Sequence, residues 1–243
     1  MTQRHPPKTF DPFVRFWWTD ASLTALLGIL LLVVFVLLPL RALDMTGTMV
    51  IDLFFALIVV SGVVAVATSR LVGALATILA IVTLTLHWWT RLATAPESLE
   101  VLDVVASMAM IATLATVVLI QVFREGPITV PRIQGAVCAY VLIGLMFALS
   151  YRLVSLLVPD AFNFTAPPPA HDPLTGQLAY FSFVTLTTVG YGDITPVHPA
   201  ARSLANLEAL VGQLFPAILI ARLVSLEIHY RQLRRESREE HGG

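Results

Sequence analysis

The residues of this 243-residue chain whose types and spacing suggest chemistry form one short stretch, Thr187-Thr188-Val189-Gly190-Tyr191-Gly192-Asp193. Its two glycines are separated by one residue, and glycine readily adopts backbone angles that other residues avoid. Such alternation lets successive carbonyl groups point to the same side, where rings of oxygens replace the hydration shell of a bare cation such as potassium. A threonine hydroxyl at the inner end adds one more oxygen. The spacing therefore indicates ion coordination by the backbone rather than by charged side chains.

The stretch matches the selectivity-filter signature of potassium channels, Thr-Val-Gly-Tyr-Gly, and the chain resembles that family. The resemblance implies that potassium ions bind to oxygens of Thr188, Val189, Gly190, Tyr191 and Gly192. One filter strand cannot surround an ion, so four chains are expected to assemble as a homotetramer. A tight glycine turn between two helices is the alternative interpretation, but it does not account for seven consecutive matches.

The same resemblance implies that residues beside the filter support it, namely Thr187, Asp193, Phe181 and Thr185. Many members of the family have a tryptophan where this chain has Phe181, and its indole can hold the filter aspartate. A phenyl ring has no hydrogen-bond donor. Asp193 is therefore expected to have a different partner.

The composition predicts an integral membrane protein. Hydrophobic residues make up 57% of the chain and charged residues 13%, against about 45–50% and about 25% in soluble domains. The net charge of −1 gives no indication of a nucleic-acid partner, and the single cysteine, Cys138, excludes an intrachain disulfide. We find no Ser/His/Asp arrangement, His-x-x-x-His motif or phosphate loop, so we expect no enzyme and no cofactor other than potassium ions.

The apolar runs predict an all-α membrane protein with six transmembrane helices, a re-entrant pore helix and a selectivity-filter loop. The pore helix is too short to cross a bilayer, so surrounding protein must shield its ends. The expected segments are an interfacial N-terminal segment at 1–20, a four-helix membrane domain at 21–123, a linker at 124–132, a pore domain at 133–228 and a charged tail at 229–243. Within the pore domain we expect a proline-rich turret loop at 159–176, the pore helix at 177–188, the filter at 188–192 and then the sixth helix.

The distribution of positive charge predicts an orientation in the cell membrane. If both termini are cytoplasmic, eleven of the fifteen Lys and Arg residues lie inside or at inner helix ends. The remaining four, Arg41, Arg91, Arg152 and Arg202, lie outside. This arrangement also places the filter at the outer side of the membrane, where the family has it.

The first four helices resemble the voltage-sensing half of six-helix channels, except in their charge. Voltage sensing requires several positive charges in the fourth helix, each worth about 2.3 kcal/mol per 100 mV. The fourth apolar run, about Leu99 to Phe123, contains no Lys or Arg. We therefore expect little or no intrinsic voltage sensing, and we interpret Asp52, His87 and Asp103 as interfacial or paired structural groups.

The resemblance also assigns roles to residues of the sixth helix. Gly212 lies twenty residues after Gly192, the family's offset for a hinge glycine, and Pro216 removes one helical hydrogen bond and favours a kink. The same offset suggests cavity or gate positions for Gln213, Ala217, Ile220, Ala221 and Ser225.

Glu208 is the costliest residue of this helix, because an intramembrane carboxyl group needs a partner or a proton. It either supports the pore helix, acts as a pH-sensitive site, or is a hydrogen-bonded or protonated packing residue.

Two other transport functions and several gating stimuli stay open. The chain could form a less selective monovalent cation channel, although such relatives usually alter the Tyr-Gly part of the filter. It could also be a subunit of a potassium uptake transporter, but such proteins carry four degenerate filter repeats where this chain has one. Tension, lipid, pH or a partner could open the pore, and the charged tail could bundle, bind anionic lipid or be solvated.

Overall fold

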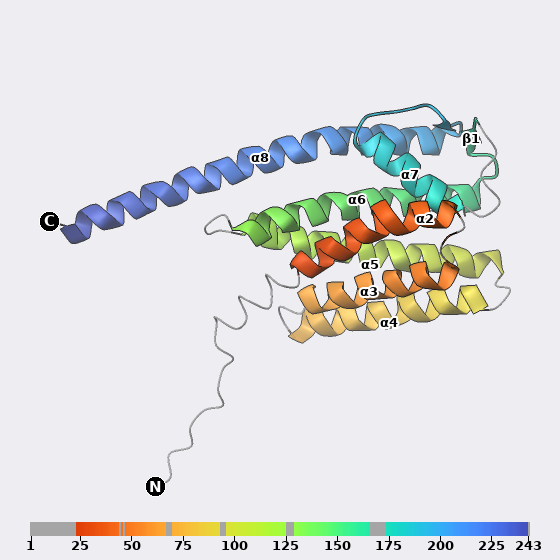
Figure 1. Cartoon of the computed structure of the whole chain (residues 1–243), viewed down its shortest axis with the longest axis horizontal. Helices are drawn as coiled ribbons and strands as arrows, with labels where there is room; N and C mark the ends of the chain where they lie inside the picture. The colour runs from red at the N-terminus through yellow and green to blue at the C-terminus, as the bar shows by residue number, and fades with distance from the viewer. Residues whose placement is uncertain are drawn as a thin grey trace, which may run out of the picture.

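The structure, a computed structural model, describes residues 23–43, 45, 47–66, 70–92, 96–124, 129–165 and 174–242. The expected N-terminal segment at 1–20 lies outside the described residues, as do parts of the expected linker and turret. The described chain is mostly helical, and its long helices lie side by side (Figure 1). One of them, at the C-terminal end, projects well beyond the others (Figure 1).

The N-terminal half consists of consecutive helices joined by short connections. Helical residues from 23 onward lead into a π-helical turn, η1 (Val33–Leu37), and then α2 (Leu38–Ala42). This wider turn precedes Pro39, which has no N–H group and whose ring crowds the carbonyl four residues earlier. The following helices are α3 (Thr48–Val66), α4 (Arg70–Leu92) and α5 (Glu97–Phe123).

The C-terminal half begins with α6 (Val130–Leu157), which carries Pro131 in its first turn, where a missing N–H costs nothing. It continues with β1 (Phe162–Phe164), α7 (Leu174–Leu186), β2 (Ile194–Pro196) and α8 (Pro199–Gly242). The expected pore helix at 177–188 thus begins and ends earlier than predicted, as α7. The helix α8 also continues through the expected tail at 229–242, which is rich in Arg, Glu and Gln, all good helix formers.

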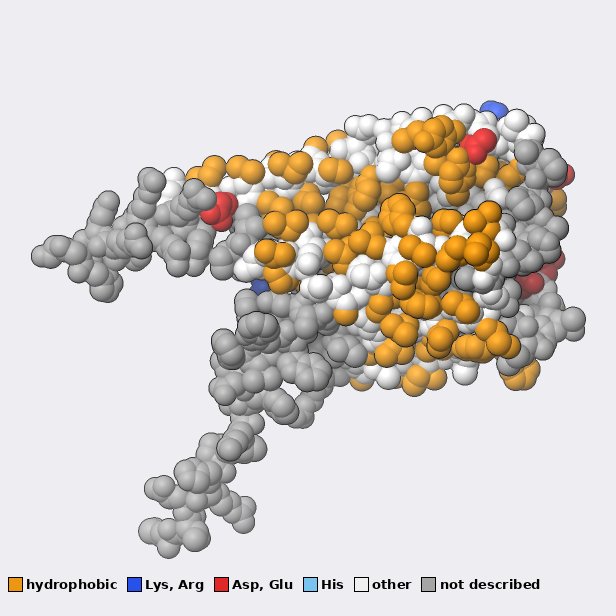
Figure 2. Space-filling model, viewed as in Figure 1, with side chains coloured by type: hydrophobic (Ala, Val, Ile, Leu, Met, Phe, Trp, Pro, Cys, Tyr) orange, Lys and Arg blue, Asp and Glu red, His pale blue; other side chains and the backbone are white. Residues whose placement is uncertain are grey.

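Helix length and apolarity make this a multi-pass membrane protein. Among the described residues, five helical stretches are long and apolar enough to cross a membrane, and α3 contributes a shorter apolar stretch, Asp52–Val63. Hydrophobic side chains cover most of the described surface in Figure 2, and the charged side chains in view lie toward its two ends. The five stretches are Leu23–Leu40, Gly73–Thr90, Glu97–Phe123, Val130–Leu157 and Pro199–Ser225.

The two short strands form an antiparallel pair that the sequence did not indicate. Phe162 lies opposite Pro196, and Phe164 lies opposite Ile194. The expected turret at 159–176 is therefore not irregular throughout. Its strand forms because the pairing partner arrives about thirty residues later in the chain, which no local pattern reveals.

The buried apolar side chains form two clusters. One joins the first helix with α3, α4, α5 and α6, and the other joins α6, both strands, α7 and the first part of α8. Phe183 of α7 and Phe215 of α8 pack against both clusters. The short helix α7 is thereby held mainly between α6 and α8.

Candidate functional site

The filter stretch begins where α7 ends, and its backbone alternates in handedness. Thr188, Gly190 and Gly192 have φ angles of +59°, +59° and +80°, and all three lie in the left-handed region. The N–H groups of Val189 and Gly190 both donate to the Val184 carbonyl, at 2.9 and 3.3 Å. The expected conformations of both glycines are confirmed, and Thr188 extends the alternation by one further position.

The filter stretch is not covered by the rest of its own chain. All residues from 187 to 193 are exposed, including the large side chains of Val189 (52%) and Tyr191 (71%). Both side chains are therefore open to contact with lipid or with another protein chain.

Three contacts hold the Thr188 end of the filter stretch, where α7 meets α6 and α8. The hydroxyl of Tyr140 donates to the Leu186 carbonyl at 3.3 Å. A methyl carbon added at Gly212 would lie only 1.8 Å from that same carbonyl oxygen. Next to Gly212, the amide of Gln213 donates to the Thr188 hydroxyl at 2.9 Å. Gly212 therefore permits a close backbone approach between α8 and α7, a packing role that the hinge interpretation did not include.

Different contacts hold the Asp193 end of the filter stretch. The N–H of Thr165, just after β1, donates to the Asp193 carbonyl at 2.9 Å, and Tyr180 forms a side-chain hydrogen bond with the Asp193 carboxylate. Tyr180 is thus the expected alternative partner of Asp193. Tyr180 directly precedes Phe181. The donor therefore lies one position earlier in the chain than the tryptophan of many members of the family.

Phe181 instead belongs to a buried aromatic cluster behind the filter. Its ring lies edge-on to Tyr151, with centroids 4.9 Å apart, and to Phe162 of β1, 5.7 Å away. The cluster ties α7 to α6 and to the small sheet. The support that Phe181 gives to the filter is therefore apolar packing.

Glu208 of α8 lies fully buried against α6 and α7, so the structure brings this carboxyl group to the expected pore helix. The Tyr151 hydroxyl donates to its Oε2 at 2.5 Å, and its Oε1 lies 2.5 Å from the Ser182 hydroxyl oxygen. The Ser182 hydroxyl in turn donates to the Gly144 carbonyl at 2.7 Å. Three helices therefore share one continuous polar network.

Counting hydrogens indicates the protonation state of this network. The Ser182 hydroxyl has one hydrogen, so it cannot donate both to the Gly144 carbonyl and to Glu208. Both contacts are satisfied only if Glu208 carries a proton and donates it to Ser182. A neutral carboxyl group also avoids the large cost of burying an unpaired charge in a membrane.

The five cavity and gate candidates on α8 lie on one face of the helix and are all exposed in the single chain. Of these, Gln213 reaches the filter through its hydrogen bond to Thr188. Pro216 lies inside α8, which continues on both sides of it. The other four, Ala217, Ile220, Ala221 and Ser225, follow Gln213 in the direction away from the filter.

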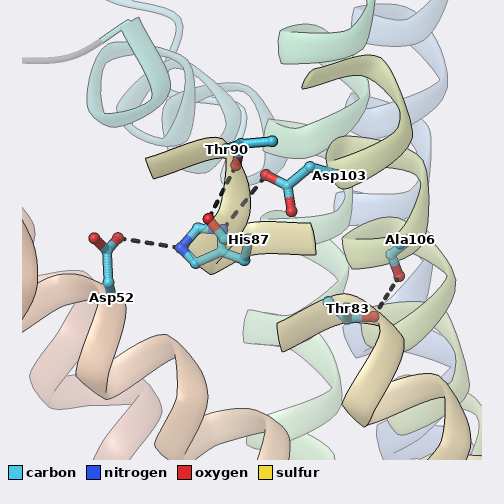
Figure 3. Close-up of polar contacts among 6 residues, drawn as sticks. All are labelled: Asp52, Thr83, His87, Thr90, Asp103 and Ala106. Atoms are coloured by element: carbon cyan, nitrogen blue, oxygen red, sulfur yellow. Dashed lines mark hydrogen bonds and ion pairs between the residues drawn. The ribbon is translucent and has the colours of Figure 1, made fainter. Parts of the chain in front are cut away.

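A second polar cluster lies in the four-helix part, well separated in sequence from the filter (Figure 3). His87 of α4 lies between two buried carboxylates, with Nε2 3.1 Å from Asp52 Oδ1 and Nδ1 3.4 Å from Asp103 Oδ2. The expectation of paired structural groups is thereby confirmed, and each residue of the trio comes from a different helix. Within the described part of the chain, Asp103 Oδ1 has no hydrogen-bond partner.

Sequence reasoning missed four residues that hold the site: Tyr140, Tyr151, Tyr180 and Ser182. Tyr180 and Ser182 lie in the predicted pore helix, so only their partners were unknown. Tyr140 and Tyr151 are separated by 46 and 57 residues from the groups they contact. The one usable signal in the sequence was Glu208, because a carboxyl group within a membrane helix needs a partner or a proton. The sequence did not indicate which residues those partners are.

The region that contains this site is similar to known ion channels. The profile of a family described as "Ion channel" matches residues 168–228. "Two pore potassium channel c" of Oryza sativa subsp. japonica is 39% identical over 89 residues, which cover 36% of this chain and 19% of that protein. "Protein LctB" of Bacillus caldotenax is 34% identical over 87 residues, 35% of this chain and 64% of that protein. "Inward rectifier potassium channel Kirbac3.1" of Paramagnetospirillum magnetotacticum is 33% identical over 92 residues, 38% and 27% of the two chains.

No solved structure gives a significant match. The chain spans less than two thirds of the length of each of these relatives. The residues that the family profile matches include α7, the filter stretch and much of α8, and they contain the signature Thr-Val-Gly-Tyr-Gly. Through this segment, the chain is similar to an ion channel family and to proteins named as potassium channels.

Proposed function

We propose that this protein is the subunit of a potassium-selective channel that conducts K⁺ passively as a homotetramer. The observation that carries the proposal is the left-handed backbone at Thr188, Gly190 and Gly192. Alternation at these positions turns successive carbonyls of 188–192 toward one side, as a stack of K⁺ sites requires. The ligands are oxygens of these five residues, and no cofactor other than potassium ions is needed.

The surface of α8 supports assembly into a tetramer. Only 11% of its membrane stretch is buried in the single chain, compared with 56% for α6. Lipid and neighbouring subunits together would cover this surface, and fourfold symmetry would bring four filter strands around one axis. Its exposed large apolar residues are Leu207, Leu210, Leu214, Ile218, Ile220 and Val224.

We further propose that six crossings place both termini in the cytoplasm of a cell membrane, with the filter near the outer face. The helix α5 occupies the position of a voltage sensor but contains no Lys or Arg, and Arg124 follows only at its end. A helix without the repeated positive charges of a voltage sensor gains little energy from the membrane field. The channel therefore has little or no intrinsic voltage sensing.

Flux measurements on purified protein in liposomes test this function. We expect K⁺ uptake that Ba²⁺ blocks and that Na⁺ does not replace. The matched control is Gly190→Ala, because alanine is strained at φ +59° while the added methyl has no neighbour within 4 Å in the single chain. This variant should assemble normally and lose K⁺ flux.

Other outcomes would identify a different function. Equal Na⁺ and K⁺ flux would indicate a less selective cation channel, and flux only in the presence of another protein would favour a transporter subunit. A steep conductance–voltage relation in planar bilayers would contradict the absence of voltage sensing.

A further inference from the structure

We propose that Gln213 is a positioning residue for the innermost ion site, where its amide holds the Thr188 hydroxyl oxygen toward the ion path. The inference rests on the proposed function and names a residue of α8 that helps determine ion binding in the filter. The contact that suggests it is the hydrogen bond from Gln213 Nε2 to Thr188 Oγ1, 2.9 Å long.

Thr188 needs such a support because its own conformation is unfavourable. It is a β-branched residue at φ +59°, a region that side chains of this type rarely occupy. Its N–H donates to the Thr185 carbonyl at 2.9 Å, which fixes the backbone but leaves the side-chain torsion free. The amide of Gln213 supplies the second constraint and fixes the hydroxyl.

Gln213 can reach the filter because its neighbour in the chain, Gly212, has no side chain and lets α8 approach the end of α7. Gly212 lies against the Leu186 carbonyl so closely that any side chain there would push α8 away from α7. Gly212 and Gln213 are adjacent in α8, and their partners Leu186 and Thr188 are two residues apart at the end of α7. Gly212 and Gln213 therefore act as one docking point between α8 and the inner end of the filter.

The chemistry of the contact suits a neutral ion site. A hydroxyl oxygen has two lone pairs, so it can accept the amide hydrogen and still offer an oxygen to a cation. The donor is uncharged, so four copies around the pore add no net charge. Loss of the donor would let the hydroxyl rotate, and an ion would then lose a pre-oriented ligand.

Block by Ba²⁺ in planar bilayers provides the test, because Ba²⁺ has nearly the size of K⁺ and twice its charge and thus binds strongly to the same oxygens. The test variant is Gln213→Met, which keeps the side-chain length and removes the donor. The control is Gln232→Met, which changes another exposed glutamine of α8 far from the filter. We expect Ba²⁺ affinity about tenfold weaker in Gln213→Met, the equivalent of one neutral hydrogen bond, and unchanged in Gln232→Met.

A second measurement keeps the inference testable if Gln213→Met conducts too little current. The midpoint of K⁺-dependent thermal stabilisation of the purified tetramer reports ion binding without conduction. It should shift to higher K⁺ concentration in Gln213→Met, while the melting temperature without K⁺ stays at the wild-type value.

The outcomes separate this inference from the function on which it rests. Wild-type protein without K⁺ flux would overturn both. Wild-type flux together with unchanged Ba²⁺ block and an unchanged K⁺ midpoint in Gln213→Met would overturn the role of Gln213 and leave the channel function intact. An equal loss of Ba²⁺ affinity in Gln232→Met would likewise overturn the specific role.

Discussion

The tightest glycine contacts of the pore segment and of the four-helix part differ in kind. In the pore segment, Gly212 lies against the backbone carbonyl of Leu186, to which Tyr140 also donates. In the four-helix part, the tightest glycine, Gly62 of α3, faces the side chain of Leu114 in α5, whose atoms would lie 2.4–3.0 Å from an added methyl. A side chain can move to another rotamer, whereas a helix backbone cannot shift alone.

The buried carboxyl groups of the two regions also differ, in how completely they are hydrogen-bonded. In the network of Glu208, both carboxyl oxygens have hydroxyl partners. In the cluster around His87, one oxygen of Asp103 has no partner within the described residues. Complete hydrogen bonding specifies a single arrangement, and incomplete hydrogen bonding tolerates several. The comparison suggests that precise geometry is concentrated where the filter must be positioned.

The largest expected effect comes from Gly212→Ala. Its methyl carbon would lie 1.8 Å from the Leu186 carbonyl oxygen, so α8 or the end of α7 must move. Because Gln213 and the filter depend on this approach, we expect K⁺ flux in liposomes to fall by at least about tenfold, the equivalent of about 1.4 kcal/mol.

The matched variant is Gly62→Ala, which meets only the Leu114 side chain. Overpacking of this kind costs about 1–3 kcal/mol in stability, but it should leave K⁺/Na⁺ selectivity unchanged. If Gly62→Ala lowered flux as much as Gly212→Ala, the contrast between backbone and side-chain contacts would be wrong.

An intermediate effect is expected for Glu208→Leu. Leucine fills the space but leaves the buried Tyr151 hydroxyl without an acceptor, which costs about 1–3 kcal/mol per subunit. The melting temperature of the purified protein should fall accordingly.

Glu208→Gln serves as the control, because a neutral amide can accept from Tyr151 and donate to Ser182. If the native carboxyl group carries a proton, this variant should melt close to the wild type. Destabilisation as large as that of Glu208→Leu would show that the group is ionised.

The smallest effect is expected for Asp103→Asn in the second cluster. The amide oxygen of asparagine can take the place of Oδ2, which faces His87. The amide nitrogen then takes the place of Oδ1, which has no partner among the described residues. We expect a loss of about 1 kcal/mol or less, measured as a shift in melting temperature, with unchanged K⁺ flux and selectivity. A change in selectivity would contradict the separation of the two regions.

The sequence by itself determined the class of the protein and the location of its site. Apolar runs and composition were sufficient to predict a helical membrane protein, because a bilayer demands long uncharged helices. The glycine spacing was sufficient to predict the left-handed backbone at Gly190 and Gly192, since a positive φ angle is a local property. The absence of positive charge in α5 is likewise visible without a structure.

The tertiary structure alone decided which groups hold that site. The partners of Glu208, the second support at Gly212 and the pairing of β1 with β2 join residues 26 to 57 positions apart. Such contacts depend on how helices pack, which side-chain periodicity does not encode. Local backbone chemistry was therefore predictable from residue types, whereas the network that keeps the filter in place required the folded arrangement of α6, α7 and α8.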